Sequence, residues 1–382
     1  MNFELRFPTE IIFGKDSIRK IGVKAQKYGD RVFLVTGKSA MRKSGAVDNI
    51  MELLNSAGVE KMYLYDQAEH DPSVETVDRG VQLAKDGDFK VIIGIGGGSA
   101  MDTAKTIASL MKNEGSAADY QSGKEITNMG VPFIAVPTTA GTGAEITNNS
   151  VITNRDKKIK QSIRSPLMIA RVAIVDPMLT ISLPPSVTAA SGMDALTQAI
   201  ETYVSLASNP FSDTLALRSI SLISKNLVKA FENGNDEGAR ENMAMGSLFG
   251  AMAFGNAALG AVHGLAHPVG ALFDIPHGVI CGLLLPYVME YNLSVKVSRY
   301  AEIADAMGQS VSGEFDEANA HRAVVTVRNL LAKLRLPQHL SDLGITQDNL
   351  SLIARSAKGS SLNNNPRPTT PESLQGILAS AL

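Results

Sequence analysis

Cysteine is almost absent from this chain, which contains only Cys281 in 382 residues. One cysteine cannot form an internal disulfide, so the chain fits a reducing compartment and we expect a cytoplasmic protein. A cysteine close to histidines could act as a nucleophile, but the neighbours of Cys281 in Val279–Leu285 are mainly apolar. We therefore expect Cys281 to be a small buried hydrophobic residue.

The chain also lacks an excess of either charge. It has 36 Lys and Arg against 38 Asp and Glu, a net charge of −2, and its basic residues are scattered. This balance does not favour nucleic acid or an anionic membrane as a partner. The first residues carry Glu4, Arg6 and Glu10 and have no apolar core, so we expect no secretory signal.

One long segment, Met243–Phe273, has no Asp, Glu, Lys or Arg and is long enough to span a bilayer. It contains Asn256, His263, His267 and Pro268, however, and it is rich in Gly and Ala rather than Leu or Ile. Polar groups of this kind are costly in lipid. We expect a tightly packed helix inside the protein, with a polar site set into it and no membrane association.

In the first half of the chain, strand-like and helix-like segments alternate. The expected helices are Ala46–Ala57 and Val74–Lys85. The expected strands are Arg31–Thr36, Lys61–Tyr65, Lys90–Ile95, Val131–Val136 and Val172–Val175. Apolar runs such as KVIIGI are typical of strands that are buried on both faces. This alternation predicts an α/β fold with a mostly parallel sheet.

After Pro184 and Pro185 the helical patterns dominate. The expected helices are Ser186–Leu206, Asn209–Phe231, Ala239–Ala258, Val297–Met307, Asp316–Leu334 and one more after Pro371. A chain of 382 residues is too long for a single compact core. We therefore expect an α/β N-terminal domain, residues 1–183, and an all-α C-terminal domain, residues 184–382.

A glycine run follows the strand KVIIGI and comprises Gly94, Gly96, Gly97, Gly98 and then Ser99. Glycines at a strand-to-helix turn let the backbone approach a ligand, and the first turn of the next helix presents free N–H groups to phosphate. The same pattern also forms a tight turn without a ligand. Asp102, too, could have a purely structural role, as an acid in the first turn that complements the helix dipole.

A second loop, PTTAGTGAE at Pro137–Glu145, follows the strand VPFIAV. It carries the hydroxyls of Thr138, Thr139 and Thr142 at the end of a strand, the edge where open α/β sheets bind ligands. It could instead be a turn capped by hydroxyls. Because the glycine run is also present, we favour a second wall of one nucleotide site.

The strongest pattern combines a carboxylate with histidines. In GMDALTQAIE, Asp194 and Gln198 lie four residues apart and share a helix face, and His263 and His267 have the same spacing. His277 completes three histidines in a segment otherwise nearly free of charge. This set favours metal or acid–base chemistry over packing, and its donors suit Zn²⁺ or Fe²⁺.

Together, GGGSAMDTAK, PTTAGTGAE, GMDALTQAIE and GAVHGLAHPVGALFDIPHGV resemble the iron-containing alcohol dehydrogenase family, essentially from end to end. The resemblance implies a nucleotide-binding α/β domain and a helical metal and substrate domain, a dehydroquinate synthase-like arrangement. It also implies hydride transfer between a nicotinamide cofactor and a small aliphatic alcohol, diol or aldehyde. A homodimer or higher homo-oligomer is expected.

The resemblance also assigns cofactor contacts to individual residues. Asp102, in the first turn after the glycine run, is a further candidate cofactor contact. Lys160 would contact the nicotinamide ribose. The pyrophosphate would bind Gly96, Gly97, Gly98 and Ser99, and Thr138 and Thr139 would line the cofactor.

For the reaction centre, the resemblance implies Asp194, His263 and His277 as metal ligands. His267 matches a histidine that is not a ligand but lies near the nicotinamide, where it could relay a proton. Asn149 and Phe254 would lie near the substrate.

The sequence departs from the family pattern at two points. Many members have His where this chain has Gln198, and an amide oxygen is a poorer ligand than imidazole for these ions. NAD-preferring members tend to have Asp after the strand RVFLVT, whereas this chain has Gly37, Lys38 and Ser39. Lys38 could bind the 2′-phosphate of NADP(H). We therefore predict that NADP(H) is used preferentially or alongside NAD(H).

Other functions remain open from the sequence alone. Gln198 keeps open a metal-independent reductase of the same fold, similar to maleylacetate reductases. A lyase resembling dehydroquinate synthase would need several Lys and Arg to hold a sugar phosphate, and Met243–Phe273 offers none. A non-catalytic binding protein is disfavoured by the intact nucleotide motifs.

Overall fold

The structure, a computed structural model, describes residues 3–5, 7–157 and 159–382 and divides the chain into two compact units. The α/β unit contains Arg6–Thr139 and Gly143–Ser182. The helical unit contains Leu183–Leu382 together with Ala140–Thr142 and Met1–Leu5. Each unit has a hydrophobic interior of its own.

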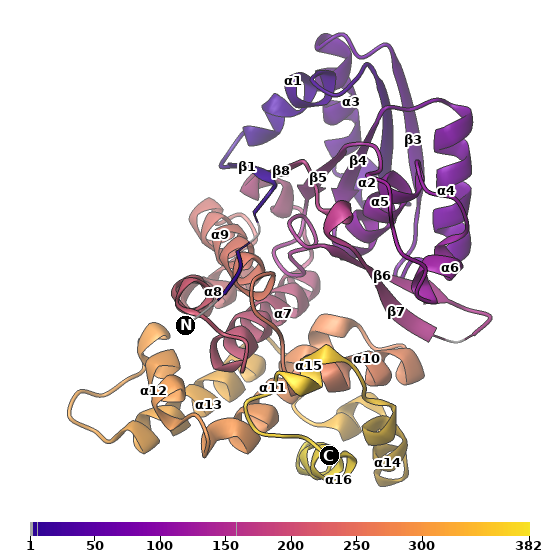
Figure 1. Ribbon diagram of the computed structural model, residues 1–382. Helices are drawn as coiled ribbons and strands as arrows, with labels where there is room; N and C mark the ends of the chain where they lie inside the picture. Colours follow the sequence, from indigo (N-terminus) through magenta and orange to yellow (C-terminus); the bar gives the residue numbers. More distant parts are fainter. Residues whose placement is uncertain (1–2, 6, 158) are drawn as a thin grey trace. The chain divides into compact units, whose positions relative to one another are not determined.

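The α/β unit is built on a six-stranded sheet whose neighbouring strands are all parallel (Figure 1). Its strands lie in the order β1 (Glu10–Phe13), β8 (Val172–Val175), β5 (Phe133–Pro137), β4 (Val91–Gly96), β2 (Arg31–Gly37) and β3 (Lys61–Ala68). The chain runs from β2 outward to β3 and then returns to β4 on the other side of β2. The strand order therefore reverses between β2 and β4, the place where open α/β sheets bind their ligands.

Helices cover both faces of this sheet. They are α1 (Ile21–Gln26), α2 (Ala40–Lys43), α3 (Ala46–Ser56), α4 (Val74–Asp86), α5 (Gly98–Leu110) and α6 (Ala117–Gln121). Successive strand residues point to opposite faces. Val32 and Leu34 of β2 belong to a core shared with α1 and α3, whereas Phe33 and Val35 belong to one shared with α4 and α5. This two-sided burial explains the continuous apolar runs in the sequence.

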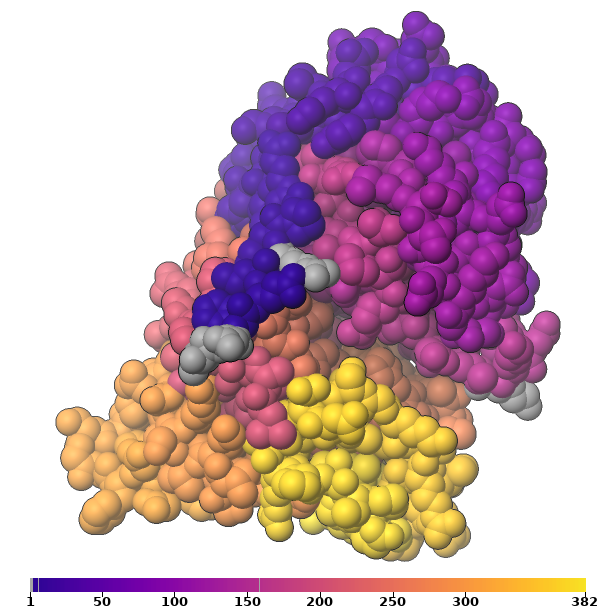
Figure 2. Space-filling view, viewed as in Figure 1, coloured from indigo at the N-terminus to yellow at the C-terminus, as the bar shows by residue number. Residues whose placement is uncertain are grey.

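The helical unit surrounds one large apolar core. Its helices are α7 (Pro185–Val204), α8 (Pro210–Glu232), α9 (Glu237–Phe254), α10 (Ala261–Phe273), α11 (His277–Leu293), α12 (Val297–Ala306), α13 (Asp316–Lys333), α14 (Gln347–Ser356), α15 (Ser360–Asn363) and α16 (Pro371–Ser380). On its surface the C-terminal residues lie beside the residues of α12 and α13 (Figure 2, yellow and orange). Among the described residues of this unit there is no strand.

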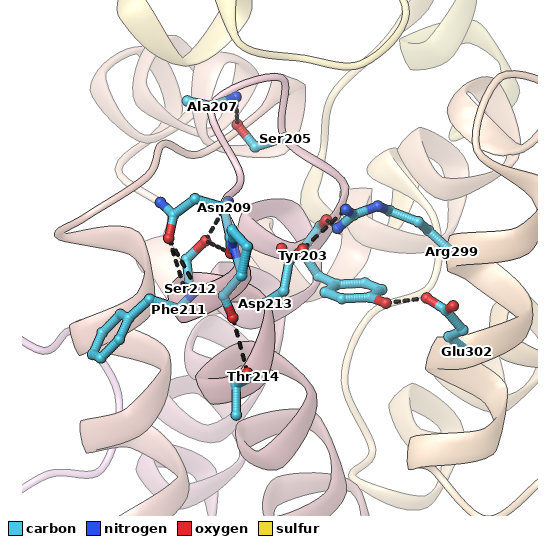
Figure 3. Close-up of polar contacts among 11 residues, drawn as sticks. Tyr203, Ser205, Ala207, Asn209, Phe211, Ser212, Asp213, Thr214, Arg299 and Glu302 are labelled. Atoms are coloured by element: carbon cyan, nitrogen blue, oxygen red, sulfur yellow. Dashed lines mark hydrogen bonds and ion pairs between the residues drawn. The ribbon is translucent and has the colours of Figure 1, made fainter. Parts of the chain in front are cut away.

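Arg299 of α12 connects the end of α7 with the start of α8 (Figure 3). Its guanidinium donates to the carbonyl oxygen of Tyr203 at 2.6 Å and to Asp213 at 2.9 Å, and it lies over the Tyr203 ring. The hydroxyl of Tyr203 donates to Glu302. These contacts hold the C-terminal end of α7, whose middle turns carry Asp194.

The structure confirms the predicted fold class but differs from the sequence analysis in several segments. The segment Met243–Phe273 is not one helix, because α9 ends at Phe254 and α10 begins at Ala261. In the part of the chain that is described, no helix combines the length and apolarity needed to cross a bilayer. Strand β1 and the antiparallel pair of β6 (Asn149–Asn154) and β7 (Ile159–Arg164) were not predicted from the sequence.

Candidate active site

Asp194 of α7, His263 of α10 and His277 of α11 come together inside the helical unit. Nε2 of His263 lies 3.4 Å from Oδ1 of Asp194, and Nε2 of His277 lies 3.8 Å from the same oxygen. Asp194 and His263 are only 3% and 4% exposed. Helix packing therefore brings together three side chains that the sequence pattern selected, from positions up to 83 residues apart.

Several atoms of this cluster are buried without a hydrogen-bond partner among the described residues: Oδ1 of Asp194, Nε2 of His263 and Oε1 of Gln198. A buried polar group normally has a partner, because leaving it unpaired costs about 1–3 kcal/mol. One such atom could be tolerated. Three of them around two adjacent turns of α7 indicate that a ligand completes the site.

Glu201 lies on the same face of α7 as Asp194, about two turns further along the helix, and it holds His263 in place. Its Oε2 lies 2.5 Å from Nδ1 of His263, and its Oε1 accepts the backbone N–H of Val262 at 2.6 Å. Glu201 is 3% exposed. The Nδ1 side of the imidazole is thus engaged, which turns Nε2 toward Asp194.

Charge in this cluster favours a cation. Burial by itself would raise the pKa of Asp194, but His263 and His277 hold that pKa below its usual range. Burial would likewise lower the pKa of His263, yet the carboxylates of Glu201 and Asp194 raise it to about 10. Two buried carboxylates around one imidazole make a site that binds positive charge strongly.

His267 lies one turn beyond His263 on α10 and is half-buried. Its ring stacks on that of His277, with centroids 5.5 Å apart and planes inclined by 21°. The donor atoms of Asp194, His263 and His277 cluster without it. His267 therefore lies beside this group of donor atoms, and its predicted role as a proton relay stays a prediction.

In the α/β unit, the two predicted loops are adjacent. Gly96 at the end of β4 pairs with Pro137 at the end of β5, and the N–H of Thr138 donates to the carbonyl oxygen of Gly96. Gly96 has φ of +146°, which favours glycine, and a Cβ on Gly97 would lie 3.2 Å from Cγ2 of Thr139. Both loops therefore form one surface at the carboxyl edge of the sheet.

Helix α5 begins at Gly98 with Gly97 as its N-cap, and no side chain caps its first turn. Asp102 does not cap it either, because Oδ2 of Asp102 accepts the backbone N–H of Val151 in β6. Burial raises the pKa of Asp102 to about 6. The first turn of α5 thus keeps N–H groups that can bind phosphate, while Asp102 attaches the helix to β6.

The remaining predicted residues occupy varied positions. Lys38 is exposed just after Gly37, the last residue of β2. Lys160 on β7 forms an ion pair with Asp71 at 2.7 Å. Asn149 begins β6 and is half-buried, and Phe254, also half-buried, ends α9 in the other unit.

Two buried residues of consequence were missed. Glu201 could have been found from the sequence, because it lies seven residues after Asp194 and shares its helix face. Lys105 on α5 is fully buried and donates to the carbonyl oxygens of Thr147 and Asn149 at 2.9 and 2.8 Å. Nothing in the sequence sets this lysine apart from a solvent-exposed one.

Sequence models of two domains match nearly the whole chain: "Iron-containing alcohol dehydrogenase" at residues 8–177 and "Fe-containing alcohol dehydrogenase family, C-terminal" at residues 188–382. The chain belongs to the iron-containing alcohol dehydrogenase family. The resemblance noted in the sequence is confirmed, and the chain is an oxidoreductase of the alcohol dehydrogenase class, as predicted.

Full-length relatives agree with this assignment. The chain is 37% identical to the 1,3-propanediol dehydrogenase of Klebsiella pneumoniae, covering 99% of this chain and 98% of that one. It is 36% identical to the NADPH-dependent butanol dehydrogenase of Clostridium saccharobutylicum, covering 99% and 97%. The crystal structure of a 1,3-propanediol oxidoreductase superposes with a TM-score of 0.96 at 38% identity and full coverage of both chains.

Proposed function

We propose that this iron-containing alcohol dehydrogenase is a metal-dependent, NAD(P)(H)-linked enzyme that interconverts small aliphatic alcohols or diols and their aldehydes. The observation that carries the metal is the buried set of unpaired atoms on Asp194, Gln198 and His263. A divalent cation would bind these atoms and balance their charge. Water alone would leave the negative charge of Asp194 and Glu201 around the single imidazole of His263 without a metal to balance it.

The fit of the donors supports Fe²⁺ or Zn²⁺ as the ion, held by Asp194, His263 and His277 with the amide oxygen of Gln198 as a further donor. A bound ion of this kind supplies Lewis-acid polarisation of a substrate oxygen. Glu201 fixes the orientation of His263. His267, stacked on His277, is the residue we assign to holding and passing on the proton of the alcohol.

The cofactor is assigned to the carboxyl edge of the parallel sheet. Its pyrophosphate would lie on the uncapped first turn of α5, against Gly96, Gly97, Gly98 and Ser99, with Asp102 holding that helix to β6. Thr138 and Thr139 form the adjacent wall. Lys160 would contact the nicotinamide ribose, which requires it to exchange its ion pair with Asp71 for the cofactor.

We assign the preference to NADP(H), with NAD(H) as the second cofactor. Lys38 stands after β2 with no acid beside Gly37 to repel a 2′-phosphate. A cavity of about 250 Å³ lies next to it, and Arg79 and Arg155 also line this cavity. Glu69 and Glu75 line it too, and Glu69 pairs with Arg155. The positive charge for a phosphate is therefore assigned to Lys38 and Arg79.

The substrate side is assigned to Asn149 and Phe254. Neither is charged, which suits short alcohols, diols and aldehydes and offers no clamp for a carboxylate. We further propose that residues 1–183 and 184–382 act as the nucleotide domain and the metal and substrate domain. A cytoplasmic location is proposed from the single cysteine, which fits a reducing compartment. A homodimer or higher homo-oligomer is proposed from the family resemblance alone.

The alternative is a metal-independent reductase of the same fold. Gln198 is the observation that favours it, because an amide is a weak ligand and the pattern expected of the family at this position is imidazole. The buried unpaired nitrogen of His263 weighs against this alternative.

Chelation and reconstitution test the proposal. Activity with an aldehyde panel and NADPH or NADH should disappear after chelation and return with Fe²⁺ or Zn²⁺. Asp194→Ala and His263→Ala should not be restored by either metal, while thermal melting confirms that they fold. Full activity of the metal-stripped variants would establish the metal-independent alternative.

A further inference from the structure

The single cysteine of the chain lies at the metal cluster. Cys281 follows His277 by one turn of α11, so both side chains lie on the same helix face. Its Sγ is 3.5 Å from Nε2 of His277, and the residue is fully buried. We expected a small buried hydrophobic residue at this position, and Cys281 is buried. The position of the sulfur against His277 does not follow from that expectation.

The donor atoms of Asp194, His263, His277 and Cys281 all lie within 4.8 Å of one another. A tetrahedral ion with metal–sulfur and metal–nitrogen bonds near 2.3 and 2.0–2.1 Å separates these two ligands by about 3.6 Å. A nitrogen and an oxygen ligand on the same ion are about 3.4 Å apart. The separations of 3.5 Å from Sγ to Nε2 of His277 and 3.4 Å from Nε2 of His263 to Oδ1 of Asp194 match these values.

A second observation, independent of the cysteine, indicates a bound ion. Oδ1 of Asp194 and Nε2 of His263 belong to side chains more than nine-tenths buried, face each other and have no hydrogen-bond partner in the described part of the chain. The sulfur therefore lies beside two buried donor atoms whose missing hydrogen bonds a bound cation would replace.

We propose that the thiolate of Cys281 is the fourth protein ligand of the metal, completing a set with Asp194, His263 and His277. This inference rests on the proposed function. On binding, the thiol releases its proton to solvent as the sulfur–metal bond forms, so metal and proton exchange one for one at this ligand. Gln198 then contributes at most a weak contact, and a soft sulfur ligand biases the site toward Zn²⁺ over Fe²⁺.

A fourth protein ligand does not exclude the substrate, because zinc sites can expand from four to five ligands. The fourth ligand changes which side chains determine the metal preference of the site. In this chain the helix α11 would supply two ligands, four residues apart, and the metal preference would depend on sulfur and not on the amide of α7.

Cobalt substitution of the full-length protein tests the proposal directly. Thiolate ligands give Co²⁺ an intense sulfur-to-metal charge-transfer absorption in the near ultraviolet, which nitrogen and oxygen ligands do not. Because the chain has one cysteine, such a band can arise only from Cys281. We expect the band in the wild-type protein at one equivalent of Co²⁺, its loss in Cys281→Ser, and its retention in the control Ser294→Ala, at the exposed C-cap of the same helix.

The affinities give a second readout. Cys281→Ser keeps the size of the side chain, and it should weaken Zn²⁺ binding by at least ~10-fold and lower the ratio of Zn²⁺ to Fe²⁺ affinity. Stoichiometric Co²⁺ binding without the band, or unchanged Zn²⁺ affinity in Cys281→Ser, overturns the inference and leaves the proposed function intact. No metal binding at all to the wild-type protein overturns both.

Discussion

Glu201 and His263 form a buried pair in which Oε2 of the carboxylate lies 2.5 Å from Nδ1 of the imidazole. Carboxylates that engage the far nitrogen of a ligating histidine fix its orientation and raise its basicity. The same carboxylate also binds the backbone N–H of Val262 at the start of α10. Glu201 thus sets both the helix that carries His263 and the direction in which its Nε2 points.

Glu201→Gln should weaken metal binding by about 10–100-fold, because the amide cannot accept from Nδ1 and from Val262 as the carboxylate does. Titration of the metal-free protein with Zn²⁺ or Co²⁺ measures this. Glu290→Gln is the matched control, since Glu290 is paired with Arg328 at the surface. Equal affinities of Glu201→Gln and wild type would show that the pair does not support the metal site.

Because Lys105 is buried, the folding stability of the α/β unit should vary with pH in the alkaline range. Its ammonium is fully buried between Asp102 and Glu145 and donates to the loop before β6. Burial lowers its pKa from 10.5 to about 8 despite both carboxylates. Between these two values the unfolded chain binds more protons than the folded one, so folding stability rises with pH in that window.

We therefore expect the free energy of unfolding of the wild type, relative to Lys105→Met, to increase from about pH 8 toward pH 10. Urea unfolding at several pH values measures the difference, and using the difference removes the contribution of the other titrating groups. Below about pH 8 the difference should be flat. A difference that falls as pH rises would contradict the lowered pKa of Lys105.

Lys38→Ala should reduce kcat/KM for NADPH roughly 10-fold, the scale of one charge-assisted hydrogen bond, and leave kcat/KM for NADH nearly unchanged. The reason is that only NADPH carries the 2′-phosphate that this lysine is proposed to bind. Lys112→Ala, exposed beyond the far end of α5, is the control. An equal loss of kcat/KM with both cofactors would show that Lys38 does not bind the 2′-phosphate.

Gly97→Ala should weaken NADPH binding by at least ~5-fold, because its new Cβ would crowd Thr139 at 3.2 Å and displace the proposed wall of the cofactor site. Fluorescence titration of NADPH measures the dissociation constant. Gly376→Ala on α16 is the control, since nothing lies within 4 Å of a Cβ there. Unchanged NADPH affinity in Gly97→Ala would place the pyrophosphate elsewhere.

Some segments were predictable because local pattern and burial coincide. The residues of β4 are all apolar because helices pack on both faces of the sheet. In α7 and α8, apolar residues recur with helical spacing over a long stretch. The pair β6 and β7 was missed because its strands, NSVITN and IKQSIR, are mainly polar and have no regular alternation of polar and apolar residues. The helix α10 was not predicted as a separate element, because Gly and Ala fill both α9 and α10 and the loop between them.

The fold class, the glycine-rich and threonine-rich loops and the choice of Asp194, His263 and His277 followed from the sequence, because they depend on residue type and spacing along single elements. Which atoms converge depends on the packing of α7, α10 and α11, which brings together positions far apart in the chain. That packing engages Nδ1 of His263 with Glu201 and buries Lys105 against the loop before β6. It also turns the sulfur of Cys281, which the sequence marks only as apolar, toward the same centre.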